Sequence, residues 1–131
     1  MMVSITKKVA VSDGWAAWQA AYDFGNAHHA FAGVLADCTL EDDVRMVTFT
    51  NGMVVKERLI GIDEGRRRIA YAVIDGPFAH HNASFQIRDN GVGGGVMIWT
   101  CDILPDEASA MVEPLMQAGI EAFARNLEAV T

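Results

Sequence analysis

Apolar and polar residues alternate at the start of the chain, and the period then changes to that of a helix. Within Val3–Val11, apolar side chains at positions 3, 5, 9 and 11 alternate with smaller or polar ones, which is typical of a strand with one buried face. Ser12 follows as the expected N-cap of a short helix, in which the aromatic residues of 15–22 recur at helical spacing. Residues 24–26 (Phe-Gly-Asn) end this helix, and we expect a second helical turn over Ala27–Phe31.

Turn residues divide the middle of the chain, from Val34 onward, into short strands. Asn-Gly pairs at 51–52 and 90–91 are typical of hairpin turns, and Asp-Gly-Pro at 75–77 ends another strand. Because each strand is followed by a short turn, we expect a six-stranded antiparallel meander. After a first strand beginning at Val34, the expected strands are Val44–Phe49, Met53–Ile60, Arg68–Ile74, Ala83–Arg88 and Val96–Ile103.

The last part of the chain has the pattern of one long amphipathic helix that begins at Pro105. Apolar residues recur there at i, i+3, i+4 and i+7, from Ala108 to Leu127. Pro114 lacks an amide hydrogen, so we expect it to kink this helix or to split off its first turns. The order of elements predicts an α+β fold in which a helix lies along one face of a sheet, with residues 1–131 forming a single domain.

The hairpin around Asn51-Gly52 decides which side chains share a face. A two-residue turn would place Arg45 opposite Arg58, and like charges directly opposite each other are unfavourable. A three-residue turn, with Gly52 in the left-handed region, places Arg45 opposite Glu57 instead. We therefore expect the second register. One face of the hairpin then carries Arg45, Val47, Phe49, Met53, Val55, Glu57 and Leu59.

Arg45 and Glu57 thus lie on the apolar face that we expect to meet the helix. An unpaired charge is costly in an apolar interior, so each needs the other if both are buried. Two interpretations stay open: an ion pair of purely structural use, inside or at the wet end of the sheet, or a pair that lines a cavity and contacts oxygen atoms of a ligand. By alternation along their strands, Tyr71, Trp99 and Phe85 (with His81) face the same interior.

Composition and charge narrow the classes of function. Of the 131 residues, 51% are hydrophobic and 21% charged, which predicts a packed core and excludes intrinsic disorder. Lys and Arg number 10 against 17 Asp and Glu, a formal charge of -7, so nucleic acid is not an expected partner. No apolar run is long enough for a membrane span or a signal peptide, and we expect a cytoplasmic protein with Cys38 and Cys101 reduced.

Other features leave alternatives open. His28-His29 and His80-His81 invite a metal hypothesis, but no H-x-x-x-H spacing is present and adjacent histidines do not readily chelate one ion. We therefore expect neither a metal site nor a cofactor, and we interpret these histidines as exposed loop residues, with a hydrogen-bonding role for the first pair at a cavity mouth as the alternative. Val96 and Ile98, on the reverse face of the last strand, form an apolar patch that leaves a homodimer open.

A set of spaced segments resembles a known family. Val44-Arg45, Lys56-Glu57-Arg58-Leu59, Asp63 through Tyr71, Gly76-Pro77 and Trp99 are similar to the polyketide cyclase/dehydratase and lipid-transport proteins of the START and birch-pollen-allergen (SRPBCC) superfamily. The similarity runs from about Val9 to Leu127. It implies the helix-grip fold: a curved seven-stranded antiparallel sheet around a long C-terminal helix, with two short helices after the first strand and a deep apolar cavity.

The resemblance also implies a function. Family members bind or transport lipid-like and aromatic molecules, so the expected partner is a small hydrophobic ligand whose polar end is oriented by Arg45 and Glu57. An aromatase/cyclase or dehydratase-type lyase using acid/base residues of the same cavity is the alternative, and an interaction module with a filled interior is a third. The chain departs from the family where Ala30-Phe31-Ala32 replaces a Trp-x-Pro element, which should alter the cavity mouth. The expected ligand-binding residues are Arg45, Val47, Phe49, Glu57, Leu59, Tyr71, Phe85, Trp99, Met116 and Ile120.

Overall fold

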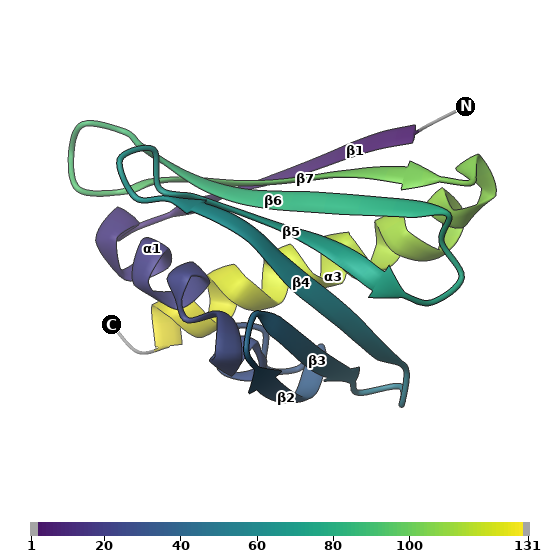
Figure 1. Cartoon of the computed structure of the whole chain (residues 1–131). Coiled ribbons are helices and arrows are strands. Elements are labelled where there is room, and N and C mark those ends of the chain that lie inside the picture. The colour runs from purple at the N-terminus through teal and green to yellow at the C-terminus, as the bar shows by residue number, and fades with distance from the viewer. Residues whose placement is uncertain (1–2, 130–131) are drawn as a thin grey trace.

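Seven antiparallel strands form one curved sheet in the computed structural model, which describes residues 3–129 (Figure 1). Their order across the sheet is β1-β7-β6-β5-β4-β3-β2, so strands β2 to β7 form the predicted meander and β1 pairs with the last of them. The strands are β1 Val3–Val11, β2 Leu35–Glu41, β3 Val44–Phe49, β4 Val54–Asp63, β5 Arg68–Asp75, β6 His80–Asp89 and β7 Gly95–Leu104.

The long C-terminal helix α3 (Ser109–Ala129) lies along the concave face of this sheet (Figure 1). Irregular pairing in β4, between Lys56 and Glu57 and again between Leu59 and Gly61, increases the local twist and helps the sheet to bend. The sequence-based prediction of a helix-grip architecture is therefore confirmed. No helix within residues 3–129 is long and apolar enough to cross a bilayer.

The β3–β4 hairpin has the predicted three-residue turn. The amide of Phe49 donates to the carbonyl of Met53 at 2.8 Å, and Gly52 has a φ of 92°, a conformation that glycine adopts without strain. Arg45 pairs with Glu57, as the charge argument requires. The predicted inner face is confirmed by burial: Arg45 is 4% exposed, whereas its neighbour Met46 on the outer face is 39% exposed.

Short helices connect β1 to β2 and precede α3. These are α1 (Gly14–Tyr22), the 3-10 turn η1 (Phe24–Asn26), α2 (Ala27–Ala30) and the 3-10 turn η2 (Asp106–Ala108). The expectation that Ser12 caps α1 was wrong: Asp13 is the N-cap, and its carboxylate accepts the amide hydrogen of Ala16 at 3.0 Å. Both residue types cap helices, and Ser12 instead donates its hydroxyl to Glu128 at 2.6 Å.

Pro114 does not end or split the C-terminal helix. The break in helical geometry comes earlier, where η2 gives way to α3, and α3 continues through Pro114. The carbonyl that loses its partner there belongs to Ala110, which is exposed, so water can satisfy it. This explains why a proline is tolerated inside the first turns of α3.

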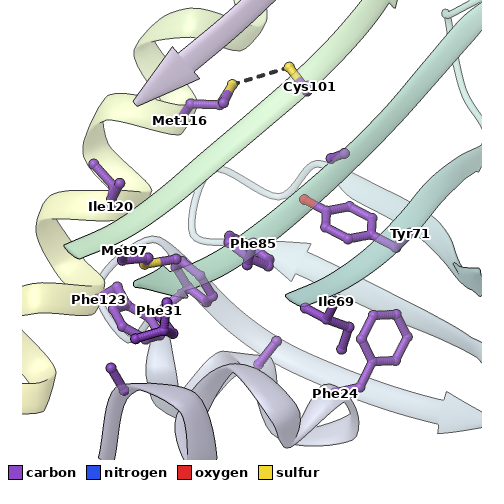
Figure 2. Packing of buried hydrophobic residues seen from close by; sticks show 14 of the residues in the cluster. Phe24, Phe31, Ile69, Tyr71, Phe85, Met97, Cys101, Met116, Ile120 and Phe123 are labelled. Atoms are coloured by element: carbon purple, nitrogen blue, oxygen red, sulfur yellow. Dashed lines mark hydrogen bonds between the residues drawn. The ribbon is translucent and has the colours of Figure 1, made fainter. Parts of the chain in front are cut away.

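The core lies between α3 and the sheet (Figure 2). Met116 of α3 meets Cys101 of β7, whose thiol lies 3.3 Å from the methionine sulfur. Phe31, which follows α2, packs its ring against Phe123 of α3 and Phe85 of β6, with centroid distances of 5.4 and 5.6 Å. The short helices and α3 are thus joined through aromatic contacts at one end of the sheet.

Candidate functional site

A cavity of about 120 Å³ lies between the inner face of the sheet and the first turns of α3. For comparison, an engineered apolar cavity of about 150 Å³ in another protein holds one benzene molecule. Exposed lining residues mark its mouth: Val54, Gly76, Pro77 and Met111. The mouth therefore lies between the β5–β6 turn and the start of α3, which share one end of the molecule (Figure 1).

Gly119 brings α3 close to the cavity wall. A Cβ atom at this position would lie 3.0 Å from the indole ring of Trp99, closer than such contacts normally come. The helix gives up about 1 kcal/mol of helix propensity relative to alanine at this position. Close approach to the sheet accounts for that cost, and the absent side chain leaves Gly119 itself as part of the lining.

Arg45 and Glu57 form a buried ion pair in the cavity wall. Nε of Arg45 donates to Oε1 of Glu57 at 2.7 Å, and the two side chains are only 5% and 11% exposed. Nη1 of Arg45 donates to the carbonyl of Phe24 at 3.2 Å. The guanidinium carbon also lies 3.9 Å from the centroid of the Phe24 ring and 5.0 Å from that of Tyr71. Its charge is thus satisfied by the carboxylate, a backbone carbonyl and two aromatic faces.

Tyr71 is a fixed hydrogen-bond donor in the same wall. Its hydroxyl oxygen accepts the indole N–H of Trp99 at 3.2 Å, and its hydrogen meets no acceptor within the described part of the chain. Burial, and then the negative charge of Glu57, raise the pKa of Tyr71 well above its usual range. The phenol is therefore protonated near pH 7, and its hydroxyl hydrogen has no acceptor among the described residues.

His81 supplies a second polar group, nearer the mouth. Its Nδ1 atom is buried and has no hydrogen-bond partner among residues 3–129, and its ring stands edge-on to Phe78 at 4.7 Å. Burial, and then the charge of His80, lower the pKa of His81 to about 4, so the imidazole is neutral near pH 7. Nδ1 has almost no accessible surface, so His81 lines the cavity with other atoms.

The interpretation of the four histidines as exposed loop residues was wrong: all four lie in α2 or β6, and only His29 is exposed. β6 begins three residues earlier than predicted, because residues 80–82 pair with residues 102–104 of β7. His28 and His29 belong to α2 and are absent from the cavity lining, so a role for them at the mouth has no support in the geometry. Within the described residues, no cluster of three His, Cys, Asp or Glu side chains is arranged to hold a metal ion.

Most of the predicted ligand-binding residues line this one cavity, and two do not. Leu59, two residues beyond Glu57 on β4, lines a second and more open groove together with Phe24 and Leu40. Ile120 is 1% exposed and belongs to the close-packed core (Figure 2). The predicted residues in the lining are Arg45, Val47, Phe49, Glu57, Tyr71, Phe85, Trp99 and Met116.

Several lining residues were missed by the sequence-based prediction. Val73 has the same parity as Tyr71 on β5, so the alternation could have identified it. Phe31 lies in the segment that replaces the Trp-x-Pro element of the family. Its ring lines the cavity beside Trp99, so one large aromatic side chain stands in place of another. Phe78 lines the cavity from the turn between β5 and β6, and no local pattern indicates that this turn lies at the cavity.

The cavity wall is mainly apolar and carries little net charge. Its ionised side chains are the buried pair Arg45 and Glu57 and, exposed to solvent at the mouth, Asp75. Oε2 of Glu57 accepts no hydrogen bond from the described residues and remains available. The arrangement can orient a hydroxyl group, which donates to a carboxylate and accepts from Tyr71, and it offers no unpaired cation to an anionic ligand.

Comparison with known proteins gives a consistent picture. A family model described as polyketide cyclase/dehydrase and lipid transport matches residues 3–131. No curated protein matches the sequence significantly. Among solved structures, XoxI from Bacillus cereus is 16% identical with a TM-score of 0.86, and the alignment covers 98% of this chain and 97% of that one.

Two further solved structures have the same fold. Norcoclaurine synthase from Thalictrum flavum, in complex with dopamine and hydroxybenzaldehyde, is 18% identical with a TM-score of 0.77, covering 100% of this chain and 89% of that one. A protein from Thermobifida fusca is 22% identical with a TM-score of 0.76, covering 95% and 92%. At these identities the likeness concerns the fold alone.

Breaking the buried ion pair should strongly destabilise the protein. We expect Arg45→Met to lower the free energy of unfolding by about 3 kcal/mol, because it leaves Glu57 buried without its partner. The double variant Arg45→Met/Glu57→Leu should recover part of this loss. Urea denaturation measures the free energy of unfolding of the single and the double variant. Asp43→Asn, which removes an exposed pair with Arg58, is the control and should cost less than about 0.5 kcal/mol. Equal costs for Arg45→Met and Asp43→Asn would contradict the expectation.

The lowered pKa of His81 predicts a loss of stability in mild acid. Its pKa is about 4 in the folded protein and 6.5 for an unperturbed histidine, so the unfolded chain takes up this proton first as the pH falls. Stability is therefore lost between about pH 6.5 and 4. We expect the melting temperature of His81→Gln to fall less than that of the wild type across this window. Above pH 7 the two melting temperatures should change with pH in parallel. Thermal melts at each pH measure this, with the exposed His29→Gln as control, and parallel curves throughout would refute it.

Proposed function

The chain belongs to the polyketide cyclase/dehydrase and lipid-transport family, and from that premise we propose that it binds one small, largely apolar molecule in the cavity between the sheet and α3. The observation that carries the proposal is the position of the buried charges. Among the described residues, Arg45 and Glu57 are the only charged side chains classed as buried, and both lie in the cavity wall. An ion pair held there at a desolvation cost can orient the polar end of a ligand.

The size and charge of the cavity restrict the ligand. A volume of about 120 Å³ suits a molecule built on one ring rather than a long acyl chain. Because the charge of Arg45 is already paired with Glu57, the lining favours a neutral polar end, such as a phenolic hydroxyl, over a carboxylate. Norcoclaurine synthase, which shares the fold, holds dopamine and hydroxybenzaldehyde, and a ligand of similar size is our proposal for this chain.

A second candidate function is acid/base catalysis in the same cavity. Glu57 with a free carboxylate oxygen, the donor Tyr71 and the neutral His81 all line it. Glu57 would accept a proton from the substrate, which neutralises its carboxylate and leaves the charge of Arg45 to stabilise the developing enolate; this fits aldol-type cyclisation or elimination of water. Tyr71, with its raised pKa, acts in this scheme as a hydrogen-bond donor to the enolate oxygen and not as a base.

Titration with 4-ethylphenol tests the binding proposal. We expect saturable, one-to-one binding in isothermal titration calorimetry, since the ring fits the cavity and its hydroxyl reaches the Glu57 carboxylate. Val55→Phe fills part of the half-buried lining and should weaken binding at least about 10-fold, or 1.4 kcal/mol. Met46→Phe, on the outer face of the neighbouring strand, is the matched control and should bind like the wild type. Absence of binding, or equal weakening by both variants, would overturn the proposal.

Turnover separates the two candidates. If the protein is a cyclase or dehydratase, NMR should detect consumption of a poly-β-ketone surrogate, and Glu57→Gln should reduce the rate at least about 100-fold while the variant still folds. Binding of the surrogate without any turnover would exclude the enzymatic candidate for this substrate class and would support a carrier.

A further inference from the structure

The lining residues of α3 and β4 show how far the cavity runs inward from its mouth. On α3 they extend from Met111 at the mouth to Gly119, about 12 Å farther along the helix. On β4 they extend from Val54 at the mouth to Glu57, about 10 Å farther along the strand. The next inward-facing residue of β4, Leu59, lines the separate groove. Glu57 therefore lies at the inner end of the cavity.

Aromatic rings close this inner end. Tyr71 lies beside Phe85 with ring centroids 5.7 Å apart, and Phe85 lies 4.9 Å from Trp99. Phe31 adds a fourth ring at 5.8 Å from Trp99, and the backbone of α3 at Gly119 comes against the edge of the same indole. The hydrogen bond from Trp99 to the hydroxyl of Tyr71 fixes two of these rings to each other. A ligand that reaches this aromatic wall can therefore extend only toward the mouth.

The polar group that can hold the ligand is at the inner end, whereas the rim carries exposed apolar side chains. Oε2 of Glu57 accepts no hydrogen bond from the described residues and is not one of their fully buried unpartnered atoms, so it keeps accessible surface. Glu57 lines this cavity and not the second groove, so that surface faces the cavity. At the rim, Val54 and Met111 are 52% and 41% exposed, beside the exposed Asp75.

We propose that the ligand is a phenol that binds with its hydroxyl group at Glu57, at the inner end, and that carries a para substituent outward through the mouth. This inference rests on the proposed binding function and makes it more specific. A hydrogen bond of about 2.8 Å and the length of the ring place the para carbon about 7 Å from the carboxylate oxygen. A substituent of two or three carbons then reaches the rim, where it covers Val54 and Met111.

This orientation defines a class of ligand. The volume of about 120 Å³ limits only the buried ring and the first atoms of the substituent, so the rest of a para substituent can be long and polar. A substituent in the ortho position would lie next to the hydroxyl group and would meet the rings of Tyr71 and Phe85. Insertion of extra atoms into a packed wall is unfavourable, so 2-substituted phenols are excluded.

Two isomers of the same size test the orientation. 4-Ethylphenol and 2-ethylphenol contain the same atoms, and isothermal titration calorimetry on the full chain measures both dissociation constants. We expect 2-ethylphenol to bind at least about 10-fold more weakly to the wild type. Trp99→Leu shortens one side chain of the aromatic wall and should reduce this ratio to about 3-fold or less. Met46→Leu, on the outer face of β3, is the control and should keep the wild-type ratio.

A tethered probe tests the exit through the mouth and needs no variant. 4-Ethylphenol that carries a tetraethylene glycol chain at the end of its ethyl group should bind within about 3-fold of 4-ethylphenol, since the added chain lies in solvent. If 4-ethylphenol binds and 2-ethylphenol binds equally well, or if the tether abolishes binding, this inference is overturned while the proposed function stands. If no phenol binds, both are overturned.

Discussion

The burial of Arg45 and Glu57 as a pair is the constraint on which the rest of the site depends. Each charge is tolerable in an apolar interior only because the other is 2.7 Å away. A slip of one residue between β3 and β4 would separate them and turn one strand over relative to the other. The pair therefore specifies the register of the hairpin, and the hydrogen bond from Arg45 to Phe24 attaches η1 to the same point. From this register follow the positions of Val47, Tyr71 and the other cavity residues.

Much of the site could be predicted from the sequence because strands have a period of two. Once the turn at Gly52 fixes one pairing, alternation assigns every residue of β3 and β4 to a face, and Arg45 and Glu57 were placed correctly by charge alone. The same rule placed Tyr71 and Trp99 inside. These assignments depend only on local spacing, and for that reason the structure confirms them.

The parts that could not be predicted depend on contacts distant in sequence. Leu59 has the correct parity, but it lines a separate groove with residues of η1 and β2, which lie far from it in sequence. The start of β6 is polar (His-His-Asn) and reads as a loop, yet β7 supplies its hydrogen-bond partners. Ser12 and Asp13 are equally good caps, and only the geometry of the chain selects the second. In each case a tertiary partner decided between two local options of similar energy.

The position of the mouth has a kinetic consequence. It lies between the β5–β6 turn and the start of α3, and none of the hydrogen bonds described within residues 3–129 joins residues 76–78 to that helix. A guest molecule can thus enter and leave through rearrangement of a turn and of flexible side chains such as Met111, while every strand pairing stays intact. Such rearrangements take nanoseconds to microseconds, far faster than opening of the sheet. The residence time of a ligand would then depend on its contacts with the cavity wall, because its exit does not require global unfolding.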